Sequence, residues 1–478
     1  MKKGVLILFF MSFFVLSSSV LFAEDAPSKG FKISNNTVLN VGISIIPEFE
    51  SNITKASEDT TKTEIKSTKN EDGSIAESTT QENTEIISDM VLHYSPSLRI
   101  KLDDSSKTIG FSVVLDYNHY LGLENSKSAK KLSELDLRSV LLGEFNKSGL
   151  VIFDFKNTLS RSATPDGQEL SGKHQNLLDS FAIGLAFKNV EDILYGKVKL
   201  GFDINYLEQS KNSSAYKDYN YASFLADFFG RWKFLPKTMA FLSASVRYQD
   251  YYESSIRDIA RAVPVNTFVG VMGQVSPHFS AKLSVGYSVN AGKSVQHDYN
   301  ANAEVIFKYN DTGAALGYLR TMRPSAYYKY TGTHKVYFNF KQKFAKYFLA
   351  ALSLNYSHIS YGKNIAYDYK DGYEKAEDGS YQRVVEDSTA KIVYTMILPK
   401  GKRKDHLVTF TPSLSYAILP WLGLKLTYNL EYKDTDYHQT STTQYTNNSD
   451  SSKNYTKTTD SHYNYIDHRV LLAIVLDY

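Results

Sequence analysis

The sequence predicts an all-β fold, a transmembrane up-and-down antiparallel β-barrel of about 18 strands, with about 16 strands as the fallback. Three observations predict it. Apolar and polar residues alternate with little interruption from Val41 to the last residue, and the connections between the alternating segments are short and long in turn. The chain also combines a mean hydropathy of −0.33 with 36 Tyr and an aromatic content of 14%. That balance is unusual for a soluble enzyme.

Residues 1–23 have the features of a secretory signal peptide. Two lysines precede an apolar run, small residues lead to Ala23, and an acidic, polar stretch begins directly after it. This order predicts cleavage near Ala23 and export from the cytoplasm. We expect residues 24–38 to form a short periplasmic segment and residues 39–478 to form a single barrel domain. No later stretch approaches ~18 uninterrupted apolar residues, so the sequence predicts no transmembrane helix.

Period-2 alternation predicts the strands. In GLKLTYNLEYKD (423–434), the even positions from 424 to 432 are apolar or aromatic, and the odd positions between 425 and 433 are polar or charged. KVKLGFDINY (197–206) and AFLSASVRYQ (240–249) repeat this scheme. Such alternation is typical of a strand with one apolar face. It predicts strands centred near residues 45, 95, 114, 140, 154, 183, 202, 227, 245, 271, 285, 305, 317, 338, 353, 412, 427 and 471.

The connections predict a meander. Turn-like connections such as 103–107, 310–313 and 419–423 alternate strictly with long polar ones such as 51–87 and 360–404. A soluble sandwich also alternates along each strand, but it should show crossovers of mixed length. A sheet in lipid must pair every backbone group, which requires a closed barrel with apolar residues outward. Short turns, and with them both termini, would then lie in the periplasm, and the long loops would be extracellular.

Aromatic residues cluster toward the two expected membrane interfaces. Amphipathic rings are favoured at such interfaces, which predicts two aromatic girdles. The alternative is that tyrosine is simply favoured in strands. The girdle candidates are Trp232, Phe234 and Trp421 beside short turns, and Tyr248, Tyr287, Tyr356 and Tyr432 toward the long loops.

Two long polar segments and one apolar piece raise separate expectations. Residues 51–86 contain no aromatic residue and are dominated by Ser, Thr, Glu, Lys, Asp and Asn. We expect this segment to be disordered or a floppy hairpin, and the similar segment 439–462 to behave alike. The apolar piece AKIVYTMIL (390–398) would break the even strand number if it crossed the membrane. We therefore expect it to be an extension or a folded part of the 360–404 loop that packs inward.

The last segment, RVLLAIVLDY (469–478), alternates and ends on Tyr478. A terminal strand that closes on an aromatic residue resembles the assembly signal of bacterial outer-membrane proteins. The resemblance implies that Tyr478 and its strand engage the barrel-assembly machinery. It also implies a bacterial outer-membrane location, with lipid and lipopolysaccharide as the surrounding partners.

Two short motifs and one longer segment resemble a known family. They are PSL at 96–98 and 412–414, and GRWKFLPKTMAFLSASVRYQDY at 230–251. In these segments and in its overall pattern, the chain is similar to the type 2 family of outer-membrane β-barrel porins. Some members of that family accompany the export of exopolysaccharide or capsule. The resemblance implies fold and location, and it offers no catalytic motif.

Strand alternation also predicts which charged side chains face the barrel interior. A slight excess of basic residues there would favour anionic solutes through the field of the pore. The alternative is that these charges form structural ion pairs across neighbouring strands. The pore-lining candidates are Arg99, Arg138, Asp154, Lys199, Asp203, Arg231, Arg247, Lys282, Glu304, Lys425 and Glu431.

Other classes of function find little support in the sequence. The chain has no Cys and nearly balanced charge, with 54 Lys and Arg against 51 Asp and Glu, so nothing argues for thiolate chemistry or nucleic-acid binding. Neighbouring pairs such as Ser357 and His358 lie on opposite strand faces and cannot act together in catalysis. We therefore predict no enzyme, cofactor or metal site. The predicted function is passive diffusion of small hydrophilic solutes, and the alternative is a non-conducting or export-linked surface barrel.

Overall fold

A computed structural model describes most of the chain after the predicted signal peptide. The described residues are 30–53, 57, 59–70, 72, 74–83, 86–123, 133–162, 175–208, 220–252, 262–292, 295–323, 325, 328, 330–345, 347–362, 373–398, 402–435 and 437–477. The predicted signal peptide (1–23) and the predicted assembly residue Tyr478 lie outside them. Within the described part of the chain, no helix is long and apolar enough to cross a membrane.

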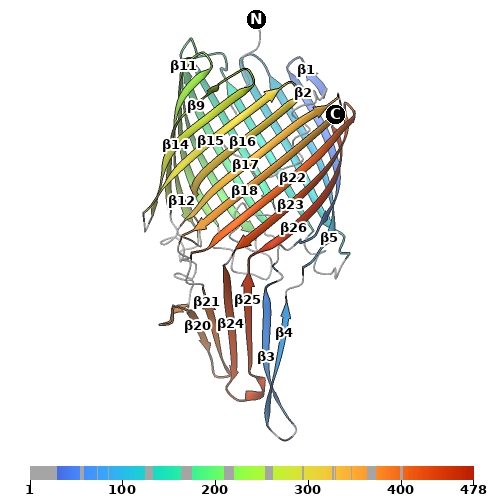
Figure 1. Cartoon of the computed structure of the whole chain (residues 1–478), viewed down its shortest axis with the longest axis vertical. Helices are drawn as coiled ribbons and strands as arrows, with labels where there is room; N and C mark the ends of the chain where they lie inside the picture. The colour runs from blue at the N-terminus through green and yellow to red at the C-terminus, as the bar shows by residue number, and fades with distance from the viewer. Residues whose placement is uncertain are drawn as a thin grey trace.

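The chain folds into a closed, antiparallel barrel of 18 strands. Each strand pairs with the next along the ring, and β2 closes the ring by pairing with both β5 and β26 (Figure 1). The barrel strands are β2 (Thr37–Glu50), β5 (Asp89–Asp103), β6 (Lys107–Tyr120), β7 (Glu134–Phe145), β8 (Val151–Ser162), β9 (Gln175–Lys188), β10 (Leu194–Glu208), β11 (Tyr221–Leu235), β12 (Thr238–Tyr251), β13 (Ala262–Gln274), β14 (Phe279–Gly292), β15 (Gln296–Tyr309), β16 (Thr312–Arg323), β17 (Thr331–Phe344), β18 (Phe348–Tyr361), β22 (Lys404–Leu419), β23 (Leu422–Thr435) and β26 (Tyr465–Asp477). Every predicted strand centre falls within one of these strands, which confirms the predicted fold class.

The two faces of the barrel wall differ as the alternation predicts. On β10, the exposed residues Val198 and Leu200 alternate with Lys197 and Lys199. Large exposed apolar side chains occur on every barrel strand, and within a strand nearly all of them are separated by an even number of residues. Because successive side chains of a strand point to opposite faces, these apolar residues share the outer face and the polar residues share the inner face. The sheet closes on itself, so it leaves no open edge.

Prolines interrupt the hydrogen-bond ladder without changing its register. The β2–β26 pairing skips Pro47, the β5–β6 pairing skips Pro96, and the β22–β23 pairing skips Pro412. Proline has no N–H to donate, so a local gap in the ladder is expected at each position. Two of these gaps fall at the PSL motifs.

The short turns gather at one end of the barrel, where the C-terminal end of β26 also lies (Figure 1). Asn146, Asp192 and Asn310 adopt positive φ angles in three of these turns. Asn and Asp tolerate this backbone conformation better than other residues with a side chain. At the same end, β1 (Phe31–Ser34) pairs with the start of β2. Part of the segment 24–38 is therefore a strand.

The long loops at the other end build a second sheet, which we call the loop sheet. Its strands, all antiparallel and in spatial order, are β19 (Glu374–Lys375), β20 (Tyr381–Glu386), β21 (Ala390–Ile397), β24 (His438–Asn447), β25 (Tyr455–His462), β3 (Thr61–Lys69) and β4 (Ile75–Asn83). They come from the loops after β2, β18 and β23, and the sheet extends away from the barrel end (Figure 1). A short 3-10 helix, η2 (Ser451–Lys453), connects β24 to β25.

The loop sheet corrects two expectations and resolves a third. Residues 61–69 and 75–83 are not a floppy hairpin, because β3 pairs with β25 of a distant loop. Segment 439–462 is likewise ordered as β24 and β25, where Tyr445 and Tyr455 stack with their rings 5.1 Å apart. Residues 390–397 form β21, which lies in the loop sheet rather than packing into the barrel. The strand number of the barrel therefore stays even.

Candidate functional site

The barrel wall carries all the predicted interior charges on one face. Each of the eleven candidates, from Arg99 on β5 to Glu431 on β23, occupies a strand position of the parity opposite to the exposed apolar residues of its strand. Their placement on the inner face follows from the pleat of the strands. Whether they line an aqueous pore stays a prediction.

Neighbouring strands bring several of these charges together. Arg247 on β12 lies 3.2 Å from Asp203 on β10, and Ser223 on the intervening β11 donates its hydroxyl to Asp203 at 3.2 Å. Farther along the same strands, Lys199 lies 4.0 Å from Asp227. These contacts are the ion pairs across strands that formed the alternative reading of the interior charges.

At the short-turn end, two predicted residues, Arg231 and Asp154, have charged partners that were not predicted. Arg231 and Lys233 on β11 contact the two carboxylate oxygens of Asp192, at 2.7 and 2.5 Å. Asp192 belongs to the turn before β10, which lies beside β11 in the sheet. Asp154 on β8 pairs with Lys197 on β10 at 2.7 Å, across the intervening Gly184 on β9. The sequence signal for Lys197 was present, because it lies on the same face as Lys199.

Farther around the wall, a tyrosine crosses a glycine to reach a carboxylate. Glu304 on β15, Gly317 on β16 and Tyr337 on β17 lie directly opposite one another. The Tyr337 hydroxyl donates a hydrogen bond to Glu304. A Cβ added at Gly317 would lie 2.1 Å from the ring of Tyr337, so only glycine leaves room for the ring there. Lys282 on β14 is directly opposite Glu304, and its ammonium lies 5.5 Å from the ring centre of Phe241.

The seam of the barrel holds a mixed charge cluster around Arg469. Its guanidinium lies 2.9 Å from Asp467 and 3.4 Å from Glu431, and 3.9 Å from Glu50 on the adjoining β2. Tyr465 donates its hydroxyl to Glu431 at 2.5 Å. The cluster joins the last strands to β2 where the ring closes. Lys425 lies on the same inner face, only 5% exposed.

His93 completes a second cluster beside the seam. Its Nε2 lies 2.9 Å from a carboxylate oxygen of Glu48 on β2, and its Nδ1 lies 3.4 Å from Asp116 on β6. An imidazole between two carboxylates links three neighbouring strands. Among the described residues, no group of three or more His, Asp or Glu side chains has the arrangement of a metal site.

A buried charge cluster at the base of the loop sheet was not predicted from the sequence. Arg403, only 1% exposed, makes two hydrogen bonds to Asp405, with Nε at 2.8 Å and Nη2 at 2.6 Å. Lys433 approaches the same carboxylate at 3.2 Å. Burial alone would lower the pKa of Arg403, but the bonds to Asp405 hold it well above its usual range. Alternation could not reveal Arg403, because it lies in a loop outside the strand pattern.

Tyrosine rings enclose the guanidinium of Arg403. Its central carbon lies 4.6 Å from the ring centre of Tyr361, 4.9 Å from that of Tyr463 and 5.4 Å from that of Tyr437. Tyr361 ends β18, whereas Tyr437 and Tyr463 flank β24 and β25. Cation–π contacts in a desolvated site are among the stronger ones. The cluster therefore fastens the base of the loop sheet to the barrel mouth.

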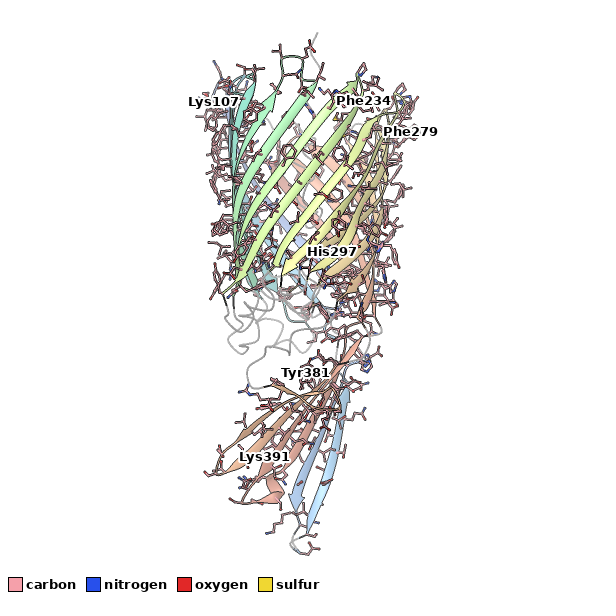
Figure 2. All side chains as sticks on the ribbon, turned by 90° about the vertical axis from the view of Figure 1, so that its left-hand side faces the viewer. Lys107, Phe234, Phe279, His297, Tyr381 and Lys391 are labelled. Carbon is pink, nitrogen blue, oxygen red and sulfur yellow. The ribbon has the colours of Figure 1, made fainter. Side chains whose placement is uncertain are left out.

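The girdle candidates are all exposed on the outer face. Their exposed fractions range from 38% for Tyr248 to 55% for Trp232. Figure 2 shows Phe234 and Phe279 near the short-turn end of the barrel and His297 near the other end. That these residues form two girdles at membrane interfaces stays a prediction.

Comparisons with known proteins find similar structures at low similarity. No family model matches the chain, and no curated protein matches it. The Acinetobacter baumannii protein OccAB4 aligns at a TM-score of 0.38 and 12% identity, over 92% of this chain and 98% of its own. The FrpB iron transporter from Neisseria meningitidis aligns at 0.42 and 10% identity, over 94% and 82% of the two chains. The siderophore receptor PirA from Acinetobacter baumannii aligns at 0.42 and 9%, over 94% and 81%.

At TM-scores below 0.5, these likenesses carry no argument about function. The resemblance to the type 2 porin family stays a prediction.

Proposed function

We propose that this chain is a bacterial outer-membrane channel for the passive diffusion of small hydrophilic solutes. The observation that carries the proposal is the closed ladder of 18 strands with an apolar outer face and a charged inner face. In lipid, only a structure without unpaired strand edges is stable, and the polar face must then enclose the interior. A barrel with this number of strands is wide enough to hold water.

The direct test is conductance of the purified barrel in a planar lipid bilayer. We expect stepwise single-channel currents, with a reversal potential in a salt gradient that reports the interior field. Lys282 and Glu304 offer matched variants, because they are directly opposite each other on the inner face. Lys282→Gln should move selectivity toward cations, and Glu304→Gln should move it toward anions. If both variants shift the reversal potential in the same direction or not at all, these two residues do not line the conducting path.

The second candidate function is a surface barrel that conducts little and acts through its loops. The observation that favours it is the loop sheet, because three loops contribute strands to one ordered structure outside the barrel. A link to exopolysaccharide or capsule export would belong to this alternative. A correctly folded barrel that leaves the bilayer silent would support it over the channel.

A further inference from the structure

Charged side chains on the inner face of the barrel are sorted along its axis. We distinguish two zones of that face by distance from the strand ends. The turn-side zone comprises the inner-face positions within six residues of the short-turn end of a barrel strand, and the loop-side zone comprises those within six residues of the other end. Exposed apolar residues mark the outer face of each strand, and the inner-face positions alternate with them.

Lysine and arginine predominate in the turn-side zone. Strands β5, β8, β9, β10, β11, β14, β15, β17 and β23 each place one or two of these residues there. The carboxylates of this zone on the described strands are fewer, namely Asp103, Glu144, Asp154, Glu304 and Asp477. The turn-side zone therefore carries a net positive charge.

Ion pairs at this end do not cancel the positive charge, because one carboxylate is shared by two basic groups. Asp103 contacts Lys101 at 2.9 Å and the turn residue Lys147 at 2.7 Å. Asp192 in the turn before β10 likewise contacts both Arg231 and Lys233.

Several basic side chains of the turn-side zone face solvent inside the barrel. Arg99, Lys156 and Lys308 are exposed although they lie on the inner face of β5, β8 and β15. A charge that is exposed on this face acts directly on ions in the interior, since no described residue covers it.

Carboxylates predominate in the loop-side zone. They come from β2, β5, β6, β7, β10, β15, β22, β23 and β26. The Lys and Arg side chains of this zone on the described strands are fewer, namely Arg138, Arg247, Arg323, Lys335, Lys433 and Arg469.

The sharing of partners is reversed in the loop-side zone, where one basic group serves several carboxylates. Arg469 contacts Glu50, Glu431 and Asp467. His93 likewise lies between the carboxylates of Glu48 and Asp116. Even with His93 counted as a cation, the loop-side zone carries a net negative charge.

Two zones of opposite charge in series make the passage of ions depend on the sign of the voltage. Carboxylates concentrate cations near the loop-sheet end, and basic groups concentrate anions near the short-turn end. A positive potential on the loop-sheet side drives each kind of ion into the barrel through the zone that attracts it. The opposite potential makes each ion enter through the zone that repels it, so fewer carriers fill the interior.

We propose that the barrel is a rectifying channel, which carries more current when the loop-sheet side is positive. This inference rests on the proposed function, because it requires an open channel. It goes beyond a general preference for anions or cations, since it assigns opposite roles to the two ends of the interior.

Currents of the purified full-length barrel in a planar bilayer at equal and opposite voltages test the proposal. The barrel is added from one chamber, and the polar loop sheet stays on that side because it cannot cross the acyl chains. In KCl of about 0.1 M, we expect the ratio of the two currents to exceed unity. At about 1 M the ratio should approach unity, because the screening length falls from about 10 Å to about 3 Å.

Variants at the two ends of the molecule locate the origin of the asymmetry. Arg99→Gln/Lys156→Gln/Lys308→Gln removes exposed charge from the turn-side zone and should move the current ratio toward unity. The matched control is Lys62→Gln/Lys66→Gln/Lys457→Gln, which removes the same charge from exposed positions of the loop sheet and should leave the ratio unchanged.

The outcomes separate this inference from the proposed function. A wild-type channel that is open but carries equal currents at both polarities in about 0.1 M KCl, or more current with the loop-sheet side negative, overturns the inference alone. A silent bilayer overturns both. An unchanged ratio in the turn-side variant, once circular dichroism shows a folded barrel, also overturns the inference. If that variant does not fold, the single variant Lys308→Gln must lower the ratio.

Discussion

At the scale of single residues, Gly317 shows how one missing side chain places a functional group. The ring of Tyr337 crosses the glycine because nothing projects from it, and so the hydroxyl reaches Glu304 two strands away. Gly313, on the same face of the same strand, has no atom within 4 Å of the position where a Cβ would lie. The two glycines are thus a matched pair with opposite surroundings.

We predict that Gly317→Ala lowers the free energy of unfolding by about 1–3 kcal/mol, because the added methyl group displaces the Tyr337 ring. Gly313→Ala should leave it unchanged or raise it slightly, since alanine loses less backbone entropy than glycine in a strand. Urea unfolding of the detergent-folded barrel, followed by tyrosine fluorescence, measures both. Equal effects of the two substitutions would show that the ring does not depend on the open space at residue 317.

Sequence alone could predict the face of a residue but not its partner. Alternation placed Asp203 and Arg247 on the inner face, yet their contact depends on the register between β10, β11 and β12, which no single strand contains. The hydrogen bond between the Tyr356 hydroxyl on β18 and His406 on β22 could not be predicted for the same reason. The burial of Arg403 could not be predicted either, because it results from rings contributed by three separate loops and strands.

At the scale of elements, the barrel strands were predictable and the loop strands were not. A barrel strand carries an apolar stripe that must face lipid, so its period is visible in the sequence. Strands β3 and β4 read TKTEIKSTK and IAESTTQEN, with hardly an apolar residue. Their order comes from backbone pairing with β25, a partner from another loop. Composition alone therefore suggested disorder where pairing produces a sheet.

The turns of the loop sheet share an acid-sensitive feature. Asp387 accepts hydrogen bonds from the backbone N–H groups of Thr389 and Ala390, at 2.7 and 2.9 Å, and from the Thr389 hydroxyl. These bonds lower the pKa of its carboxyl group. Asp378 and Asp450 make similar bonds in two other turns, and their pKa values are lowered as well.

We predict that the β20–β21 turn opens in acid. Because the folded pKa of Asp387 lies below its unfolded value, its contribution is complete above the unfolded pKa and is lost as the pH falls through the folded pKa. Amide hydrogen exchange of residues 387–390, corrected for intrinsic rates, should therefore rise below about pH 4. Asp387→Asn keeps an accepting oxygen that does not titrate, so its protection should not change over this range. A variant with the same acid transition as the wild type would assign the opening to other groups.

At the scale of the whole molecule, the two ends of the barrel are unlike. One end carries short turns, and the other carries the loop sheet (Figure 1). If the loops lie outside the cell, as their length predicts, trypsin added to intact cells should cleave after exposed lysines of the loop sheet, such as Lys62. Lys237, exposed in the turn between β11 and β12, should be cut only after the outer membrane is permeabilised. Mass spectrometry of the released peptides distinguishes the two, and early cleavage at Lys237 would reverse the orientation.

The pairing of β3 with β25 has a consequence for the order of assembly. Thr61 lies opposite Asp460, so the two halves of this joint are separated by nearly the whole length of the barrel-forming chain. Contacts so distant in sequence are slow to form while the intervening chain is loose, since closing that loop costs entropy. Once β26 has paired with β2, the chain segments that lead to β3 and β25 begin from neighbouring strands. Little further loop entropy is then lost when β3 pairs with β25. The β3–β25 pairing would thus form last. In a pulse-labelling experiment, protection of its backbone amides from exchange would show that the barrel has already closed.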